Sequence, residues 1–192
     1  KSSNMVTVDG VKYLGSRNNP YLVAYKCVED ISVVTIKEGC KILSNSLVNG
    51  HENVTEIYIP STVKDLSNDS LDFCSLTKIV VDCKNQYFSS KDGVLYDKDG
   101  TTLKYFPQSL PISEFSVPLG VEKIDNYAFN YNRFLEKLIL SDTLKEIGER
   151  AFYQTESLTN IYLPNNFVTF DLYVFWGIKN LKCNEKDGGF YL

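Results

Sequence analysis

The amino-acid sequence predicts one α/β, strongly β-rich solenoid, a right-handed superhelix of short coils stacked along a parallel sheet. Two observations predict this fold. Apolar residues recur with a fixed period of 23 residues between Ile112 and Leu163, and self-similarity at such a period is typical of stacked repeats. Two turn-bounded apolar segments, near residues 9–26 and 92–107, indicate β-hairpins added to the stack.

The repeat is clearest in two consecutive coils. The first places apolar or small residues at Ile112, Phe115, Val117, Pro118, Val121, Ile124, Ala128 and Phe129, and the second repeats the frame 23 residues later at Leu135, Leu138, Leu140, Ser141, Leu144, Ile147, Ala151 and Phe152. Because Phe115 and Val117 are two residues apart, they point to one face of a short strand. Pro118 lacks a backbone N–H and ends that strand. One coil cannot bury this surface alone, whereas stacked coils can.

The same frame extends in both directions and predicts repeats over residues 31–181. The expected strand centres are separated by 23, 22, 36, 23 and 23 residues, at Val34, Ile57, Ile79, Phe115, Leu138 and Ile161. The one long interval predicts a hairpin insert at about residues 84–111. Leu181 begins a last, incomplete coil.

The segment before the repeats is expected to be a hairpin cap over residues 1–30. Residues 1–8 are predicted to be a loose arm. The segments 9–14 and 21–26 are strand candidates, and the Gly-, Asn- and Pro-rich stretch 15–20 between them is a strong turn signal. Together they predict a β-hairpin that covers the first coil.

The insert repeats the pattern of the cap. Residues 92–96 read Asp-Gly-Val-Leu-Tyr, and residues 9–13 read Asp-Gly-Val-Lys-Tyr. A turn at 97–100 that contains Asp-Gly, followed by a return strand at 103–107, predicts a second hairpin. After the repeats, residues 182–192 form a polar tail whose Phe-Tyr-Leu end is expected to cover the open stack.

Composition bounds the class of protein. The chain has 192 residues, 43% of them hydrophobic, and a net charge of −4, so we expect one domain over residues 1–192 and no footprint for nucleic acid. No apolar run approaches the roughly 18 residues of a membrane span, so we expect no direct membrane insertion in this segment. The chain opens without Met or a signal peptide, so we expect a processed or trimmed chain whose targeting and anchoring segments lie elsewhere.

The cysteines favour buried thiols over a framework of disulfides. Their number is odd, and no two are separated by only two residues: Cys27, Cys40, Cys74, Cys83 and Cys183. Cys40 occupies the interior slot held in other coils by Val63, Val121, Leu144 and Phe167. Cys74 is also expected to point inward. A disulfide that involves Cys27, Cys83 or Cys183 remains the alternative.

Signals for chemistry are sparse. His51 is the only histidine and is expected in a solvated turn between coils. No nucleophile, histidine and acid set forms around it, and no His or Cys spacing fits a zinc site. Glu146 and Glu149 occupy outward positions that suit a solvated surface. We therefore expect no catalytic residues, no metal site and no cofactor.

The better candidate is an extended surface. Residues between the core positions of each strand point outward and stack into a ladder, a surface through which repeat proteins commonly bind. The proposed binding residues on this sheet face are Glu56, Tyr58, Val80, Lys137, Ile139 and Tyr162. Tyrosine is enriched at binding hot spots. The alternative is that β-propensity alone favours Tyr, Val and Ile at exposed strand positions.

The repeat frame resembles that of the BspA-like leucine-rich repeat family of bacterial surface proteins. The segments 121–129 and 144–152 are similar to its consensus, and the hairpin at 92–96 is similar to one found in the family. Ser46-Leu47 and Ser70-Leu71 depart from the usual Ala-Phe pair. The resemblance implies a leucine-rich-repeat solenoid that is secreted or on the cell surface and takes part in adhesion and host-protein binding.

These observations favour a non-catalytic module that binds a protein partner, such as a host extracellular protein, through its sheet face. One alternative is a structural spacer in a larger surface protein. A second is a glycan-binding module, in which Tyr58 and Tyr162 would stack on sugars. The single histidine argues against an enzyme.

Overall fold

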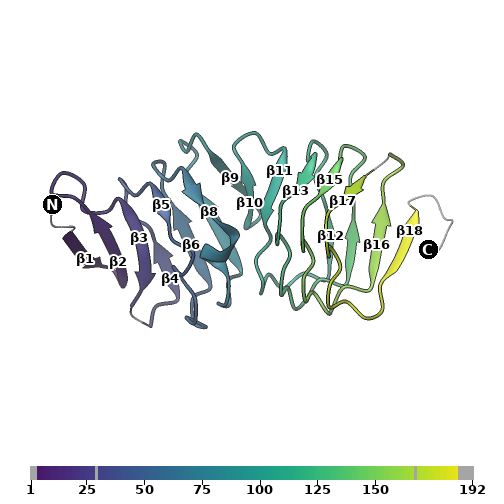
Figure 1. The fold of residues 1–192 in the computed structure, drawn as a ribbon, viewed down its shortest axis with the longest axis horizontal. Coiled ribbons are helices and arrows are strands. Elements are labelled where there is room, and N and C mark those ends of the chain that lie inside the picture. Colours follow the sequence, from purple (N-terminus) through teal and green to yellow (C-terminus); the bar gives the residue numbers. More distant parts are fainter. Residues whose placement is uncertain (1–3, 29, 167, 186–192) are drawn as a thin grey trace. The chain divides into compact units, whose positions relative to one another are not determined.

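A computed structural model describes residues 4–28, 30–166 and 168–185, which form a β-solenoid (Figure 1). Short strands dominate, and the only helix among the described residues is the 3-10 helix η1 (Asn68–Leu71). The chain divides into two compact units, Lys1–Lys98 (unit 1) and Asp99–Leu192 (unit 2). No described segment forms a helix of the length and apolarity that crossing a membrane requires.

Unit 1 is built from two sheets and a hairpin. One sheet has the order β1-β2-β3-β5-β7: β1 (Asn4–Val8), β2 (Val11–Gly15), β3 (Val23–Cys27), β5 (Ile42–Leu43) and β7 (Asp65–Leu66). The other is parallel and contains β4 (Val33–Thr35), β6 (Glu56–Ile59) and β8 (Lys78–Val81). The hairpin pairs β9 (Phe88–Lys91) with β10 (Val94–Asp97).

Unit 2 repeats the two-sheet design with parallel strands. One row of strands contains β11 (Thr102–Tyr105), β13 (Lys123–Ile124), β15 (Glu146–Ile147) and β17 (Thr169–Phe170). The other contains β12 (Glu114–Ser116), β14 (Lys137–Ile139), β16 (Asn160–Leu163) and β18 (Lys182–Glu185). Each coil adds one strand to each row, which is the arrangement that the repeat predicts.

The strand positions confirm the predicted frame. All six expected strand centres lie within strands, namely β4, β6, β8, β12, β14 and β16. The register follows the repeat, because Leu138 pairs with both Phe115 and Ile161, each 23 residues away. This register keeps every core position of one coil above the same position of the next.

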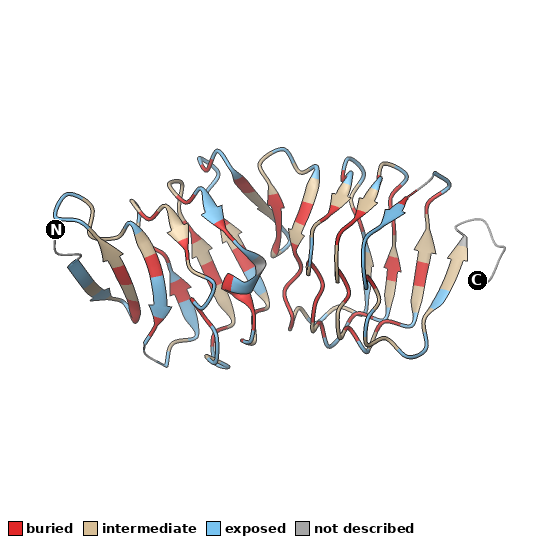
Figure 2. Cartoon of the chain, viewed as in Figure 1, coloured by how far each residue is buried: buried red, intermediate tan, exposed pale blue. Residues whose placement is uncertain are grey.

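Apolar side chains of successive coils stack to form the core of unit 2, and Figure 2 shows buried residues alternating with more exposed ones along the strands. Phe129 is fully buried. Its ring stacks on Phe106 with centroids 4.7 Å apart, and lies 5.0 Å from Phe152, which in turn stacks on Phe175 at 5.5 Å. Aromatic pairs at these distances add to the stabilisation from burial.

Where the usual Ala-Phe pair is replaced, the slot stays buried. Leu47 and Leu71 are both fully buried. A leucine therefore fills the Phe slot in these coils of unit 1 without opening the core.

The prediction of a loose N-terminal arm is wrong for residues 4–8. They form β1, which pairs antiparallel with β2. The turn between them is Asp9-Gly10, with φ of 48° and 76°. Positive φ at both central residues is the tight hairpin geometry that Asp-Gly favours. The strand was missed because it is an edge strand whose residues stay largely exposed, so its apolar alternation is weak.

The second Asp-Gly pair adopts the same geometry. Asp92 and Gly93 have φ of 52° and 83° and form the turn between β9 and β10. In both hairpins the strand after the turn carries a buried tyrosine, Tyr13 in β2 and Tyr96 in β10. The predicted likeness of the two segments is therefore present in the structure.

The chain after Leu181 continues the stack before it leaves the described residues. Lys182–Glu185 form β18, which pairs in parallel with β16, so the expected tail begins as a strand. The predicted covering segment at residues 190–192 lies outside the described residues, as does Phe167, expected in the interior slot. The other members of that slot, Cys40, Val63, Val121 and Leu144, are fully buried.

Candidate functional site

The outward residues of unit 1 align across β4, β6 and β8. Tyr58 is opposite both Thr35 and Val80, and Glu56 is opposite both Val33 and Lys78. Alternate side chains of a strand point to opposite faces, and the alternating residues Ile57 and Ile79 are buried. Tyr58 and Val80 are half-buried, so they form an apolar line that solvent still reaches.

Local contacts hold this line in place. The Tyr58 hydroxyl donates a hydrogen bond to Oε2 of Glu56 at 2.9 Å. That bond ties the two predicted site residues of β6 together. The bond restrains the orientation of the Tyr58 ring, which solvent still reaches in part.

A shallow groove runs along this face. Its volume is about 370 Å³, and its lining residues are Thr35, Ile36, Glu38, Tyr58, Ile59, Pro60, Val80 and Asp82. Glu38 and Asp82 are exposed, and Oε1 of Glu38 accepts a hydrogen bond from Ser61 Oγ at 2.7 Å. The groove therefore has an apolar floor and two carboxylates at its rim.

Unit 2 carries a second aligned face, on β12, β14, β16 and β18. Ile139 is opposite both Ser116 and Tyr162, and Lys137 is opposite Glu114 and Asn160. Lys137 Nζ lies 3.2 Å from Glu114 Oε2 and 5.0 Å from the centroid of the Tyr162 ring. The Lys137 ammonium thus contacts both the Glu114 carboxylate and the face of the Tyr162 ring. The contact with the ring is favourable because the ring face carries negative charge density.

The structure brings the six predicted site residues together in two groups. Glu56, Tyr58 and Val80 lie on adjacent strands of unit 1, and Lys137, Ile139 and Tyr162 lie on adjacent strands of unit 2. All six are half-buried. Each group therefore offers a partly accessible apolar surface with a charged residue beside it.

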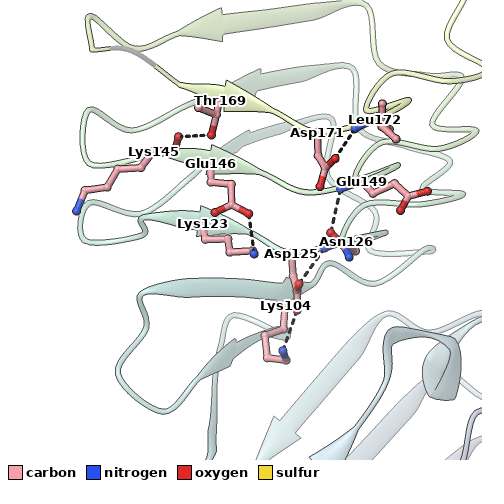
Figure 3. Close-up of polar contacts among 10 residues, drawn as sticks. All are labelled: Lys104, Lys123, Asp125, Asn126, Lys145, Glu146, Glu149, Thr169, Asp171 and Leu172. Carbon is pink, nitrogen blue, oxygen red and sulfur yellow. Dashed lines mark hydrogen bonds and ion pairs between the residues drawn. The ribbon is translucent and has the colours of Figure 1, made fainter.

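Ion pairs join successive coils on the other row of strands in unit 2, and Figure 3 shows two of them, Lys104–Asp125 and Lys123–Glu146. Lys104 pairs with Asp125 at 2.8 Å, Lys123 with Glu146 at 2.7 Å, and Lys145 with Glu122 at 2.9 Å. The hydrogen bond to Glu146 raises the pKa of Lys123. Because these charges already satisfy one another, this face is less suited to a partner than the aligned apolar lines.

A hollow of about 460 Å³ in unit 2 was not predicted. It is lined by Tyr127, Arg150, Tyr153, Tyr173 and Trp176. The sequence does hold a signal, because Tyr127, Arg150 and Tyr173 are spaced by 23 residues, as are Tyr153 and Trp176. Large side chains therefore recur in two columns of the repeat. The signal was missed because these residues lie in turns, where no strand alternation marks a side chain as outward.

Groups capable of chemistry are few among the described residues. No set of three or more His, Cys, Asp or Glu side chains there is arranged to hold a metal. His51 lies in its expected turn but is only half-exposed.

The cysteines are free thiols, so the alternative of a disulfide is not realised. Cys27, Cys40 and Cys74 are buried, Cys183 is partly buried and Cys83 is exposed. Burial raises the pKa of Cys27 to about 12. The thiolate is the reactive form, so the buried cysteines serve as small apolar residues of the core.

The comparison with protein families decides the type of repeat. Six copies of the BspA type leucine rich repeat region match residues 19–92 and 102–185. The chain belongs to this family. Its two matched segments cover the strands and turns that carry both aligned faces and the aromatic hollow. No protein with a curated function gave a match.

Solved structures of other proteins share the fold. The pneumococcal vaccine antigen PcpA aligns with a TM-score of 0.65 and 20% identity, over 88% of this chain and 55% of that one. A leucine-rich repeat protein from Eubacterium ventriosum aligns with a TM-score of 0.58 and 17% identity, over 97% of this chain and 73% of that one.

A leucine rich cell surface protein from Faecalibacterium prausnitzii aligns with a TM-score of 0.57 and 20% identity, over 79% of this chain and 52% of that one. The chain thus spans about half the length of this protein and of the pneumococcal antigen. At these identities the likeness establishes the leucine-rich-repeat fold.

Proposed function

We propose that this BspA-type repeat chain is a non-catalytic binding module of a secreted or cell-surface protein, and that it binds a protein partner through its aligned sheet faces. The observation that carries the proposal is the register of β4, β6 and β8, which lines up Thr35, Tyr58 and Val80 along a groove. Repeat proteins use such extended faces for binding. The membership of the family and the surface protein among the similar structures support the location.

The chemistry of the groove favours a particular kind of partner segment. Glu38 and Asp82 at the rim are exposed carboxylates, and the whole chain carries a net charge of −4. A segment with an apolar or aromatic residue between Lys or Arg residues would match both the floor and the rim. Tyrosine at the centre of such a contact is a common anchor of protein interfaces.

The test is a binding screen of the purified chain on an array of extracellular-matrix proteins and mucins. A saturable signal on at least one protein is expected, and the double variant Tyr58→Asp/Tyr162→Asp should abolish it, because it places a charge in the apolar line of each unit. Binding should also weaken as the salt concentration rises from about 50 to about 500 mM, since ion pairs at an exposed rim are screened.

A matched control is the double variant Tyr25→Asp/Tyr87→Asp. These tyrosines are 42% and 52% exposed, and neither lies on a strand of the aligned faces or lines the groove. The control should keep the binding signal, with circular dichroism used to verify that both variants fold. Binding that survives the face variant would refute the assignment of the face. A chain that binds no protein on the array would refute the binding function and favour a structural spacer.

A further inference from the structure

The aromatic hollow of unit 2 lies outside the sheet faces, and its backbone geometry is unusual for its side chains. Tyr127, Arg150 and Tyr173 have φ of 58°, 50° and 55°. This left-handed region favours glycine, and side chains as large as these occupy it at a cost. Three successive coils nevertheless place a Tyr or Arg there, so the slot holds large side chains against the preference of the backbone.

Contacts between coils hold these side chains in fixed positions. The backbone N–H of Tyr127 donates to the carbonyl of Glu149, and that of Arg150 donates to the carbonyl of Leu172, both at 3.1 Å. Arg150 Nη1 then donates to the Tyr127 hydroxyl at 3.0 Å and to Glu149 Oε1 at 2.6 Å. The Arg150 guanidinium also lies over the Tyr173 ring at 5.2 Å. The polar groups are therefore positioned before any ligand arrives.

Two aromatic rings of the hollow remain open to solvent. Tyr173 is 52% exposed and Trp176 is 54% exposed, and the rings meet edge to face with centroids 5.3 Å apart. Exposed aromatic side chains gathered in a concave site are typical of ligand-binding surfaces. Such rings offer flat apolar faces, on which the C–H face of a sugar ring can stack.

The charges of the hollow limit what it can hold. A cationic ligand would meet the like charge of Arg150. An anionic ligand would compete with Glu149 for Arg150 and would be repelled by that carboxylate. The Arg150–Glu149 ion pair leaves the site neutral overall but rich in hydrogen-bond donors and acceptors. The hydrogen bonds of Arg150 to Tyr127 and Glu149 both use Nη1, and the guanidinium has further N–H donors.

We propose that this hollow binds a short neutral saccharide, which stacks on Trp176 and Tyr173 and hydrogen-bonds to the Arg150–Glu149 pair. Sugar hydroxyls both donate and accept, so they can serve the carboxylate and the guanidinium at once. A proline-rich peptide could also stack on the rings, but its backbone offers carbonyl acceptors and few donors, so it would add no hydrogen bond to the Glu149 carboxylate. The site is separate from the proposed protein-binding faces, so either can fail without the other.

The experiment uses the only tryptophan of the chain, Trp176, as its own reporter. The full chain is titrated with lactose, maltotriose, cellotriose and N-acetylchitotriose, up to about 50 mM, since weak sites bind with Kd values on the order of 1 mM. The expected result is a saturable change in tryptophan emission with at least one of them. Choline carries a positive charge and sialyllactose a negative one. Both should have Kd values at least tenfold higher than that of the best neutral sugar, because each would lose about one favourable contact.

Variants identify the site. Tyr173→Ala should weaken binding at least about tenfold, because it removes one stacking ring. Tyr87→Ala is the matched control, since Tyr87 is also 52% exposed but lies in unit 1, and it should leave the affinity unchanged. Arg150→Lys keeps the charge but loses the planar fork of donors, and should also weaken binding.

Three outcomes would overturn the proposal. One is the absence of a saturable change with every neutral saccharide. Another is a response that Tyr173→Ala and Arg150→Lys leave intact, which would place binding elsewhere. The third is saturable binding of an oligoproline peptide, or of a charged probe, in preference to the sugars.

Discussion

The side chain of Asn126 accepts, on Oδ1, a hydrogen bond from the backbone N–H of Glu149 one coil further on, at 2.9 Å (Figure 3). The carboxamide can approach because the residue before Glu149 is Gly148. A Cβ at Gly148 would lie against Asn126 Oδ1 and only 2.7 Å from the Asn126 backbone nitrogen. Gly148 is thus required by the closeness of the coils.

We expect Gly148→Ala to lower the free energy of unfolding by about 1–3 kcal/mol, the usual cost of forcing an atom into a packed site. Urea unfolding of the two chains measures it. Glu156→Ala, an exposed change in the same unit, should alter stability by less than about 0.5 kcal/mol. If the Gly148→Ala chain had the same free energy of unfolding as the parent chain, the coils would separate at this point at little cost.

The stacked rings of the core lead to a second prediction. Phe129 is fully buried between Phe106 and Phe152, so Phe129→Ala should destabilise the chain by about 3–5 kcal/mol through lost burial and a cavity. Phe134→Ala removes the same atoms from a side chain that is 44% exposed and should cost far less. Equal losses in thermal unfolding would contradict the stacked core.

Alkaline pH should weaken the fold in a defined window. Burial raises the pKa of Tyr13 and of Tyr96 to about 12, whereas a tyrosine in an unfolded chain titrates near pH 10. Between these values the unfolded chain has released protons that the folded chain keeps. The stability contributed by these groups is therefore fully present below about pH 10 and is lost as the pH rises towards about 12.

The measurement is the unfolding free energy as a function of pH, from about pH 8 to about pH 12. Tyr96→Phe removes one of the two groups and should reduce the fall in stability above about pH 10. The buried Cys27, whose pKa is also about 12, contributes a fall that begins at lower pH in every variant.

Thiol labelling should follow burial. Iodoacetamide is expected to modify Cys83 first, because it is the exposed cysteine, and Cys183 more slowly. Burial raises the pKa of Cys27, Cys40 and Cys183, which lowers the thiolate fraction. Cys27, Cys40 and Cys74 should react only after unfolding. Mass spectrometry of the labelled chain measures the order, with Cys83→Ser as the control. Labelling of a core cysteine as fast as Cys83 would contradict it.

The sequence predicted the repeat frame because a core position leaves a strong signal at every coil. Phe115, Leu138 and Ile161 could be placed in strands, and Tyr58 and Val80 on one face, from the alternation of strand side chains alone. Whether that face binds a partner stays a prediction. The boundary between the two units, at Lys98 and Asp99, left no comparable signal.

The parts that were missed depend on relations that a linear pattern does not carry. The first strand, β1, is held by pairing with β2 rather than by its own burial. The aromatic hollow gathers Tyr127, Arg150 and Trp176 from turns of successive coils. The side chains of turn residues have no fixed inward or outward direction. The direction of the Arg150 side chain therefore follows only from the backbone conformation of the turn.

The parallel register of unit 2 has a mechanical consequence. Leu138 pairs with Ile161, and each strand bonds only to the strands of the adjacent coils. Tension applied from the C-terminal side therefore loads one coil at a time, and the ladder opens in sequence. Each released coil of 23 residues adds roughly 80 Å of extended chain. Under load we therefore expect the unit to lengthen in near-equal steps rather than to open in a single event.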